Sequence, residues 1–170
     1  RIQKTLVSAG YIFEILDLEK EKLGTPSARI TIEKGDVEFR SVSFSYNGLT
    51  EALSGVSCSV KNGEKVALVG PSGGGKSTLI NLIPRFYEVT SGTILIDGKS
   101  TRDMNLTDLR AQIAIVPQDV TLFSGTVLEN IRYGRLEATD SEVRDAAQAA
   151  NAHSFIERLE RGFGTEIGER

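Results

Sequence analysis

Hydrophobic residues recur at three- and four-residue spacing along the first 23 positions, at Ile2, Leu6, Ala9, Phe13 and Leu16. This spacing predicts an amphipathic helix. Residues 24–29, GTPSAR, are rich in helix-breaking residues and predict a linker. We therefore expect a connector helix with its linker over residues 1–29 and one domain over residues 30–170.

Within residues 30–170 the hydrophobic pattern changes between two periods. Alternation, or a short apolar run bounded by turn residues, predicts a strand, and three- to four-residue spacing predicts a helix. The expected strands are residues 37–46, 57–60, 65–70, a hairpin at 92–100 about Asp97-Gly98, and 113–118. The expected helices are residues 77–83, 106–112, 125–134, 142–151 and 152–162. Strands interleaved with helices indicate an α/β fold.

Several residues refine this pattern locally. Thr139 and Glu142 form a capping box before one helix, and Asn151 can cap the next. Cys58 lies in an expected strand, which favours a small buried side chain. As the single cysteine, it excludes an internal disulfide and a multi-cysteine metal site.

Composition and charge exclude some functions. The chain has 20 Lys and Arg against 23 Asp and Glu, a net charge of −3, and no basic block. Charge therefore gives no reason to expect nucleic-acid binding. No apolar run reaches the roughly 18 to 20 residues that cross a bilayer. The chain begins at Arg1 rather than Met, so we expect it to be a fragment cut at both ends.

Residues 70–77 match the phosphate-loop pattern G-x-x-x-x-G-K-[ST] between an expected strand and an expected helix. Glycines let phosphate oxygens approach the backbone, and successive amides at a helix start point at the anion. Lys76 would reach the β- and γ-phosphates, Ser77 would hold Mg²⁺, and Thr78 would touch a further phosphate. The alternative is a glycine-rich turn with an exposed lysine. The expected nucleotide-binding residues of this loop are Gly70, Pro71, Ser72, Gly73, Gly74, Gly75, Lys76, Ser77 and Thr78.

A second carboxylate motif has a simpler interpretation. Residues 93–97, TILID, are similar to an apolar strand that ends in a Mg²⁺-binding Asp. Because Gly98 follows at once, we interpret Asp97 as a turn residue. No N-K-x-D guanine motif is present, which argues against a small GTPase.

The chain resembles the nucleotide-binding domain of ABC transporters, in the exporter branch that fuses membrane and ATPase segments. The motifs VSFSYNG, GPSGGGKST, RFYEVTSGTILIDG and IAIVPQDVTLFSGTVLENIRYG carry the resemblance. It implies an α/β P-loop ABC ATPase fold with an antiparallel β subdomain and a partial parallel core sheet, the C-terminal half of the domain being absent. Residues 1–23 are similar to the end of the last membrane helix and its connector.

The resemblance also implies residue roles. Tyr46 would stack on adenine, and Gln118 would contact Mg²⁺ and the attacking water. Residues 119–135 would form part of the groove for the coupling helices of the transmembrane domain, where Leu122 and Phe123 are either groove contacts or core residues.

Two further positions complete the comparison of motifs. Residues 165–170, TEIGER, are similar to the segment before the signature motif. His153 does not match the family's switch histidine, so we expect it at the surface or packed on a helix.

The resemblance implies the ATP-binding portion of an exporter ATPase at the cytoplasmic face of a membrane. The expected ligands are ATP and Mg²⁺, and the expected partner is a second nucleotide-binding domain arranged head to tail. The 170 residues contain no signature motif, Asp-Glu strand or switch histidine. We therefore expect the chain alone to bind nucleotide weakly, not to hydrolyse it, and to be soluble but prone to self-association. A non-hydrolytic nucleotide-binding regulatory module and a soluble P-loop cassette ATPase are the alternatives.

Overall fold

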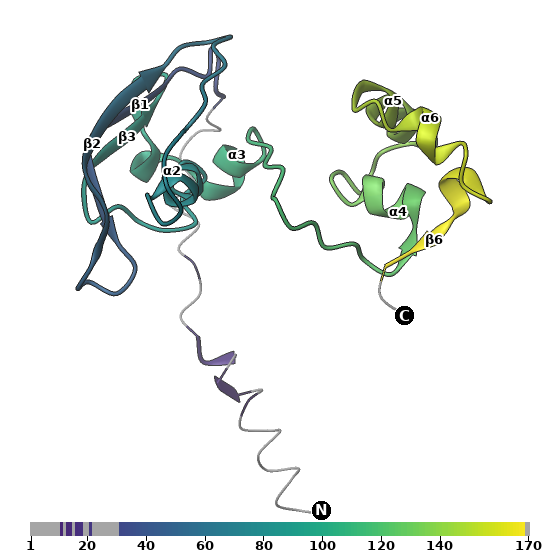
Figure 1. The fold of residues 1–170 in the computed structure, drawn as a ribbon, viewed down its shortest axis with the longest axis horizontal. Coiled ribbons are helices and arrows are strands. Elements are labelled where there is room, and N and C mark those ends of the chain that lie inside the picture. Colours follow the sequence, from purple (N-terminus) through teal and green to yellow (C-terminus); the bar gives the residue numbers. More distant parts are fainter. Residues whose placement is uncertain (1–10, 12, 15, 19–20, 22–30, 169–170) are drawn as a thin grey trace, which may run out of the picture. The chain divides into compact units, whose positions relative to one another are not determined.

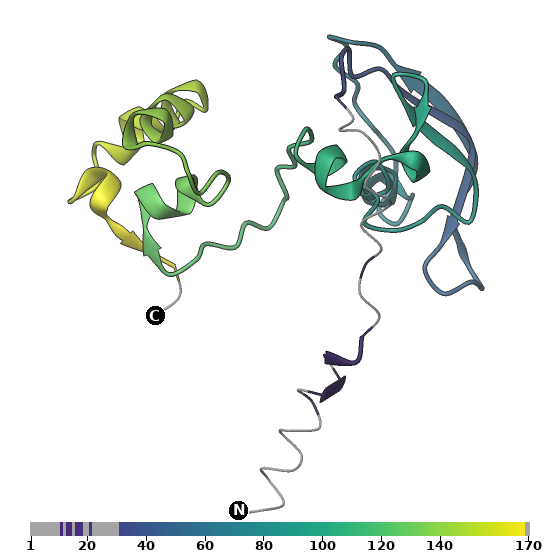
Figure 2. The same cartoon turned by 180° about the vertical axis from the view of Figure 1, so that it is seen from behind.

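The structure, a computed structural model, describes residues 11, 13–14, 16–18, 21 and 31–168. They belong to two compact units, Arg1–Ala114 and Ile115–Arg170, seen from opposite sides in Figure 1 and Figure 2. Helical conformation at Tyr11, Phe13, Glu14 and Leu16 agrees with the expected connector helix. The expected linker at residues 24–29 lies outside the described residues.

The first unit is built on a four-stranded antiparallel sheet with the order β2-β1-β3-β4. Figure 1 labels β1, β2 and β3 of this sheet. Its strands are β1 (Val37–Ser45), β2 (Glu51–Val60), β3 (Ser91–Ile96) and β4 (Lys99–Ser100). β1 is central and pairs with β2 on one side and β3 on the other. The first two expected strands and the expected hairpin are therefore confirmed.

A bulge in β1 keeps its hydrophobic residues on one face of the sheet. Phe39 and Val42 are three positions apart, so strict alternation would send them to opposite faces. The register shifts between them, and Ser41 there has a φ of 47°. Both hydrophobic side chains are buried as a result. Gly92 of β3 makes room, because a Cβ there would lie 2.3 Å from the carbonyl oxygen of Ser41.

Two helices pack on this sheet, α2 (Lys76–Leu82) and α3 (Leu106–Arg110), with a 3₁₀ turn η1 (Thr101–Asp103) before α3. The cluster under α2 consists of Phe39, Val42, Phe44, Leu53, Leu79, Leu82 and Ile94. The cluster under α3 consists of Ile96, Met104, Leu106 and Leu109. Both helices were expected from the sequence. Because their buried faces pack on the sheet, the segments before and after each helix are held in place.

The second unit is mainly helical. It contains β5 (Gly125–Thr126), α4 (Val127–Arg132), α5 (Asp140–Ala149), α6 (His153–Ile156), the 3₁₀ turn η2 (Gly162–Gly164) and β6 (Glu166–Ile167). β5 and β6 pair antiparallel. Its buried core consists of Val127, Val143, Ala147, Ile156 and Phe163. The capping box at Thr139 and Glu142 is confirmed, and a second one at Thr126 and Glu129 was not predicted.

The strands expected at residues 65–70 and 113–118 are absent. Both segments lack regular secondary structure and have no ladder partners among the described residues, and the side chains of Val69 and Val116 are 89% and 93% exposed. Apolar runs of this kind are stable strands only between neighbouring strands of a parallel sheet. The prediction of a partial parallel core sheet is therefore not realised within the described residues.

Three smaller expectations are wrong. Cys58 is exposed rather than buried, because β2 is an edge strand whose second half receives little cover. Asn151 does not cap a helix start: it follows the C-cap of α5, has a φ of 56° and donates its N–H to the carbonyl of Gln148. The last helix is also shorter than expected, because α6 ends at Ile156.

Candidate functional site

The glycine loop is shaped by its contact with β2. Gly73 and Gly75 have φ values of 78°, a conformation that L side chains rarely adopt. Gly75 is the N-cap of α2. A Cβ on Gly75 would lie 2.6 Å from the carbonyl oxygen of Ala52 and 2.6 Å from Cδ2 of Leu53. Only glycine therefore fits where the first turn of α2 meets β2.

Donor groups gather in this loop. The Lys76 ammonium folds back and donates to the carbonyl oxygens of Gly70 at 2.9 Å and Pro71 at 2.6 Å. Among the described residues, no acceptor lies on the amides of Gly73 or Gly75. Lys76 is half-buried, whereas residues 70–74 are exposed. A cation beside free amides in an exposed loop is a donor set that suits phosphate oxygens.

Two hydroxyl residues follow the lysine. Ser77 is exposed, and none of the described residues hydrogen-bonds its hydroxyl. Thr78 is 7% exposed, and its Oγ1 lies 3.0 Å from Oη of Tyr46. Tyr46 follows β1 and is 56% exposed. The structure therefore brings together the two ends of the expected site, residue 46 and the end of the phosphate loop.

Gln118 and the expected groove lie in the second unit. Gln118 is exposed in an irregular segment, so its assignment to the phosphate site stays a prediction. Leu122 and Phe123 are 48% and 50% exposed and therefore are not core residues. The rings of Phe123 and Tyr133 contact each other, with centroids 4.4 Å apart and an interplanar angle of 35°.

A hollow of about 390 Å³ adjoins this ring pair and is lined by Phe123, Ser124, Glu129, Asn130, Arg132, Tyr133 and Leu136. Asn130 fixes the backbone of Phe123 from both sides. Its Oδ1 accepts from the Phe123 N–H at 2.8 Å, and its Nδ2 donates to the Phe123 carbonyl at 2.9 Å. Sequence patterns did not single out Asn130, because a lone polar residue in a helix carries no motif.

Asp97 is a turn residue, as expected, and it also has a second role. Its φ is 50°, and Gly98 follows with a φ of 76°. Its Oδ2 accepts from the amides of Glu33 and Lys34, and its Oδ1 accepts from those of Gly35 and Asp36, at 2.8–3.0 Å. These amides hold the pKa of the Asp97 carboxyl below its ordinary value. Asp97 thus anchors the segment that enters β1.

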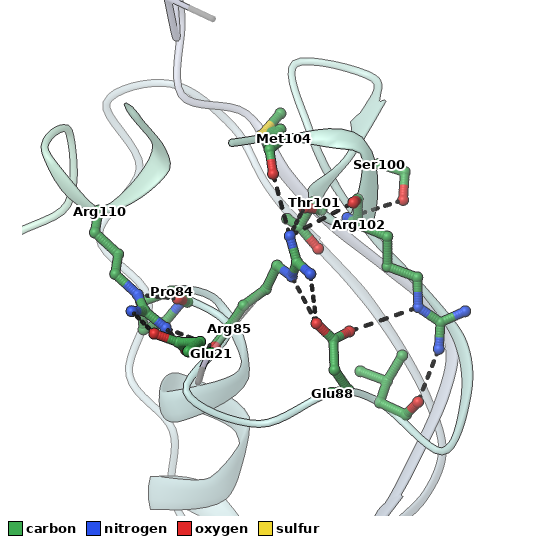
Figure 3. Close-up of polar contacts among 10 residues, drawn as sticks. Glu21, Pro84, Arg85, Glu88, Ser100, Thr101, Arg102, Met104 and Arg110 are labelled. Carbon is green, nitrogen blue, oxygen red and sulfur yellow. Dashed lines mark hydrogen bonds and ion pairs between the residues drawn. The ribbon is translucent and has the colours of Figure 1, made fainter. Parts of the chain in front are cut away.

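Arginine side chains hold the segment after α2 through hydrogen bonds (Figure 3). Arg85 has a φ of 53°, and its side chain is only 11% exposed. Its Nη1 donates to the carbonyl oxygens of Thr101 at 2.9 Å and Met104 at 3.2 Å. Its Nε donates to Glu88 at 2.9 Å. The loop after α2 is thereby tied to η1.

Arg110 of α3 makes a second set of bonds in the same region (Figure 3). It donates to the carbonyl oxygens of Pro84 and Arg85, both at 2.9 Å. It also donates to both carboxylate oxygens of Glu21, at 2.8 and 2.6 Å, which lowers the pKa of Glu21. A residue of the expected connector is therefore bonded to α3.

The remaining observations concern metals and membranes. No group of three or more His, Cys, Asp and Glu residues that could hold a metal ion occurs in the described part of the chain. None of the helices that the structure describes is long and apolar enough to cross a membrane. His153 is half-buried at the start of α6 and lies beside the Phe163 ring, with centroids 5.6 Å apart, as expected of a packing histidine.

Comparison with known proteins agrees with the fold and the loop. The ABC transporter family matches residues 53–166, more than half of the sequence, and the chain belongs to this family. It is 52% identical over 162 residues to multidrug export ATP-binding/permease proteins of Staphylococcus aureus strains NCTC 8325 / PS 47 and COL. The alignment covers 94% of this chain and 28% of each relative.

A solved structure gives the same assignment. A bacterial Atm1-family ABC exporter with ATP bound matches with a TM-score of 0.85 and 42% sequence identity. The match covers 99% of this chain and 30% of the exporter chain. The predicted family and the P-loop ABC ATPase fold class with its antiparallel sheet are therefore confirmed, whereas the parallel core sheet is not formed within the described residues. The chain spans less than a third of the length of these proteins.

Proposed function

We propose that this chain is the ATP-binding portion of the ATPase domain of an ABC exporter, located at the cytoplasmic face of a membrane. The observation that carries the proposal is the 3.0 Å contact between Tyr46 and Thr78. It joins an exposed aromatic ring to the end of the phosphate loop across 32 residues of sequence. A planar base and a phosphate chain need these two kinds of group within one site.

Different residues of the loop would bind different parts of the nucleotide. Gly73 and Gly75 offer amides that have no acceptor among the described residues. Lys76 offers a charge to the β- and γ-phosphates, and Thr78 offers a hydroxyl. Tyr46 offers a ring face for adenine. The exposed hydroxyl of Ser77 fits Mg²⁺, which prefers oxygen ligands. Bound Mg²⁺ would neutralise charge on the phosphate oxygens.

Binding of Mg·ATP to the full chain tests the proposal. A fluorescent ATP analogue should bind and be displaced by ATP. Lys76→Ala should weaken binding by about tenfold or more, because a charge-assisted bond to phosphate contributes about 1.5–3 kcal/mol. Lys65→Ala is the matched control, because Lys65 is exposed and lies at the start of the segment that leads into the loop. Equal affinity of the two variants would contradict the proposal.

Hydrolysis is assigned to the whole exporter rather than to these residues alone. We propose that Gln118 contacts Mg²⁺ and the attacking water, and that a second nucleotide-binding domain completes the site head to tail. The chain alone should then show no steady-state ATPase activity. An activity that is lost on Lys76→Ala would refute this part.

The proposed partner of the second unit is the transmembrane domain. Its coupling helices would dock beside Phe123, whose exposed ring and Asn130-held backbone support this assignment. Phe123→Ala in the whole exporter should lower transport-coupled ATPase activity while ATP affinity is retained. Unchanged coupling would argue against docking at this position.

A further inference from the structure

Three aromatic rings meet beside the phosphate loop. Phe44 and Tyr46 have centroids 4.8 Å apart and an interplanar angle of 83°, and Tyr46 and Tyr87 have centroids 5.0 Å apart at 85°. Phe44 and Tyr87 complete the triangle at 5.5 Å. Near-perpendicular pairs at these distances are favourable arrangements of aromatic rings.

The burial of the three rings is uneven. Phe44 is 4% exposed and belongs to the core under α2, whereas Tyr46 is 56% and Tyr87 44% exposed. The two tyrosines therefore lie on a buried ring and keep much of their own surface in solvent. Core packing alone does not require two tyrosines to remain this exposed.

Tyr87 comes from a segment that is itself held in place. The preceding Phe86 donates its N–H to the carbonyl of Asn81, and Arg85 is bonded to η1. Tyr46, in contrast, follows the end of β1, where residues 46–50 form an exposed turn. Its ring is thus oriented by contacts from outside its own turn: Tyr87 on one side and the Thr78 hydroxyl at its end.

We propose that Tyr87 is a positioning residue that, together with the Thr78 hydroxyl, holds the Tyr46 ring ready to stack on a nucleotide base. The inference rests on the proposed function, because it presumes that Tyr46 meets a base. Pre-orientation matters because a side chain that is already ordered loses less freedom when the ligand binds. Tyr87 acts through Tyr46 and needs no contact with the ligand.

The expected effects follow from these contacts. An edge-to-face pair or a neutral hydrogen bond changes an equilibrium by about two- to tenfold. Tyr87→Leu should weaken Mg·ATP binding to the full chain by about this factor. Tyr87→Phe, which keeps the aromatic ring, should bind Mg·ATP as tightly as the parent chain. Tyr46→Phe, which keeps the ring but loses the bond to Thr78, should weaken binding by a similar factor.

Inorganic tripolyphosphate separates positioning from general damage. It has the phosphate chain but no base, so its affinity should be the same in the parent chain, Tyr87→Leu and Tyr46→Phe. Tyr133→Leu is the matched control, because Tyr133 is a 61% exposed tyrosine of the second unit. It should change neither affinity.

The outcomes distinguish this inference from the function on which it rests. If Tyr46→Ala leaves ATP affinity unchanged, base stacking itself is wrong. If Tyr46→Ala weakens ATP binding but Tyr87→Leu and Tyr46→Phe do not, the positioning role is wrong and the function stands. Equal losses for ATP and tripolyphosphate in Tyr87→Leu would also overturn it. If Tyr87→Leu does not fold, Tyr87→Met, which removes the ring but keeps an apolar side chain of similar length, decides the question.

Discussion

Replacement of Arg85 by Met tests whether the arginine contacts after α2 hold the first unit together. Met keeps an unbranched stem of similar length but donates no hydrogen bond. The carbonyl oxygens of Thr101 and Met104, whose residues are 3% and 2% exposed, would lose the Arg85 donor. The ion pair with Glu88 adds little, because that carboxylate is 56% exposed.

The magnitude follows from the two carbonyl bonds. The Thr101 carbonyl keeps a bond from the Met104 N–H at 3.3 Å, so the Met104 carbonyl is the acceptor that loses its partner. A buried acceptor left without a partner costs about 1–3 kcal/mol, so we expect a loss of about 2 kcal/mol. Native domains are stable by only about 5–15 kcal/mol. For a chain of this size the loss corresponds to a fall in melting temperature of about 4–8 °C.

Urea and thermal unfolding followed by circular dichroism and tyrosine fluorescence measure the effect. The chain has no Trp and four Tyr, and Tyr46 and Tyr87 report on the first unit. Arg85→Lys should be intermediate, because an ammonium lacks the planar fork that reaches several acceptors. Arg40→Met is the control, since Arg40 is 63% exposed and pairs with the neighbouring Glu38. Equal midpoints for Arg85→Met and Arg40→Met would refute the reasoning.

Three more substitutions test other contacts. Asp97→Asn should destabilise the first unit at pH 7. Because the folded state lowers the pKa of Asp97, the difference in urea midpoint between the variant and the parent should shrink as pH falls below about 4. The control is Asp103→Asn, since Asp103 is exposed. Gly75→Ala should abolish Mg·ATP binding in the displacement assay, whereas Gly63→Ala, with a φ of 77° but open space around it, should not. Thr139→Ala should cost about 1 kcal/mol in urea unfolding by loss of the capping box, and Thr139→Ser should retain most of it. A pH-independent difference, retained binding, or equal losses in the two Thr139 variants would contradict these expectations in turn.

Features that depend on neighbouring residues in sequence were predicted well. The turn at Asp97-Gly98 and the capping box at Thr139 each form through the chemistry of a few adjacent residues. The apolar runs containing Val66 and Val116 were predicted as strands, but a strand also needs partners for its backbone. The sequence shows that such a run is hydrophobic, but it does not show whether neighbouring strands are present to pair with it.

In the candidate site, too, residues of a local motif were predicted and residues defined by long-range contacts were not. Lys76 and Ser77 follow from a motif whose spacing is local. Tyr87 and Arg85 were missed, although both lie in the stretch RFYE that carried part of the family resemblance. Their roles arise from contacts with residues 46 and 101–104, and no periodicity of the sequence marks contacts at that separation.

The exposed thiol of Cys58 makes the chain suitable for single-site labelling. The sequence contains one cysteine, so a maleimide dye would attach at one position without removal of other thiols. Cys58 lies on β2, the strand against which Gly75 shapes the glycine loop. A dye at this position would convert a change of environment along β2 during nucleotide binding into an optical signal from the otherwise unaltered sequence.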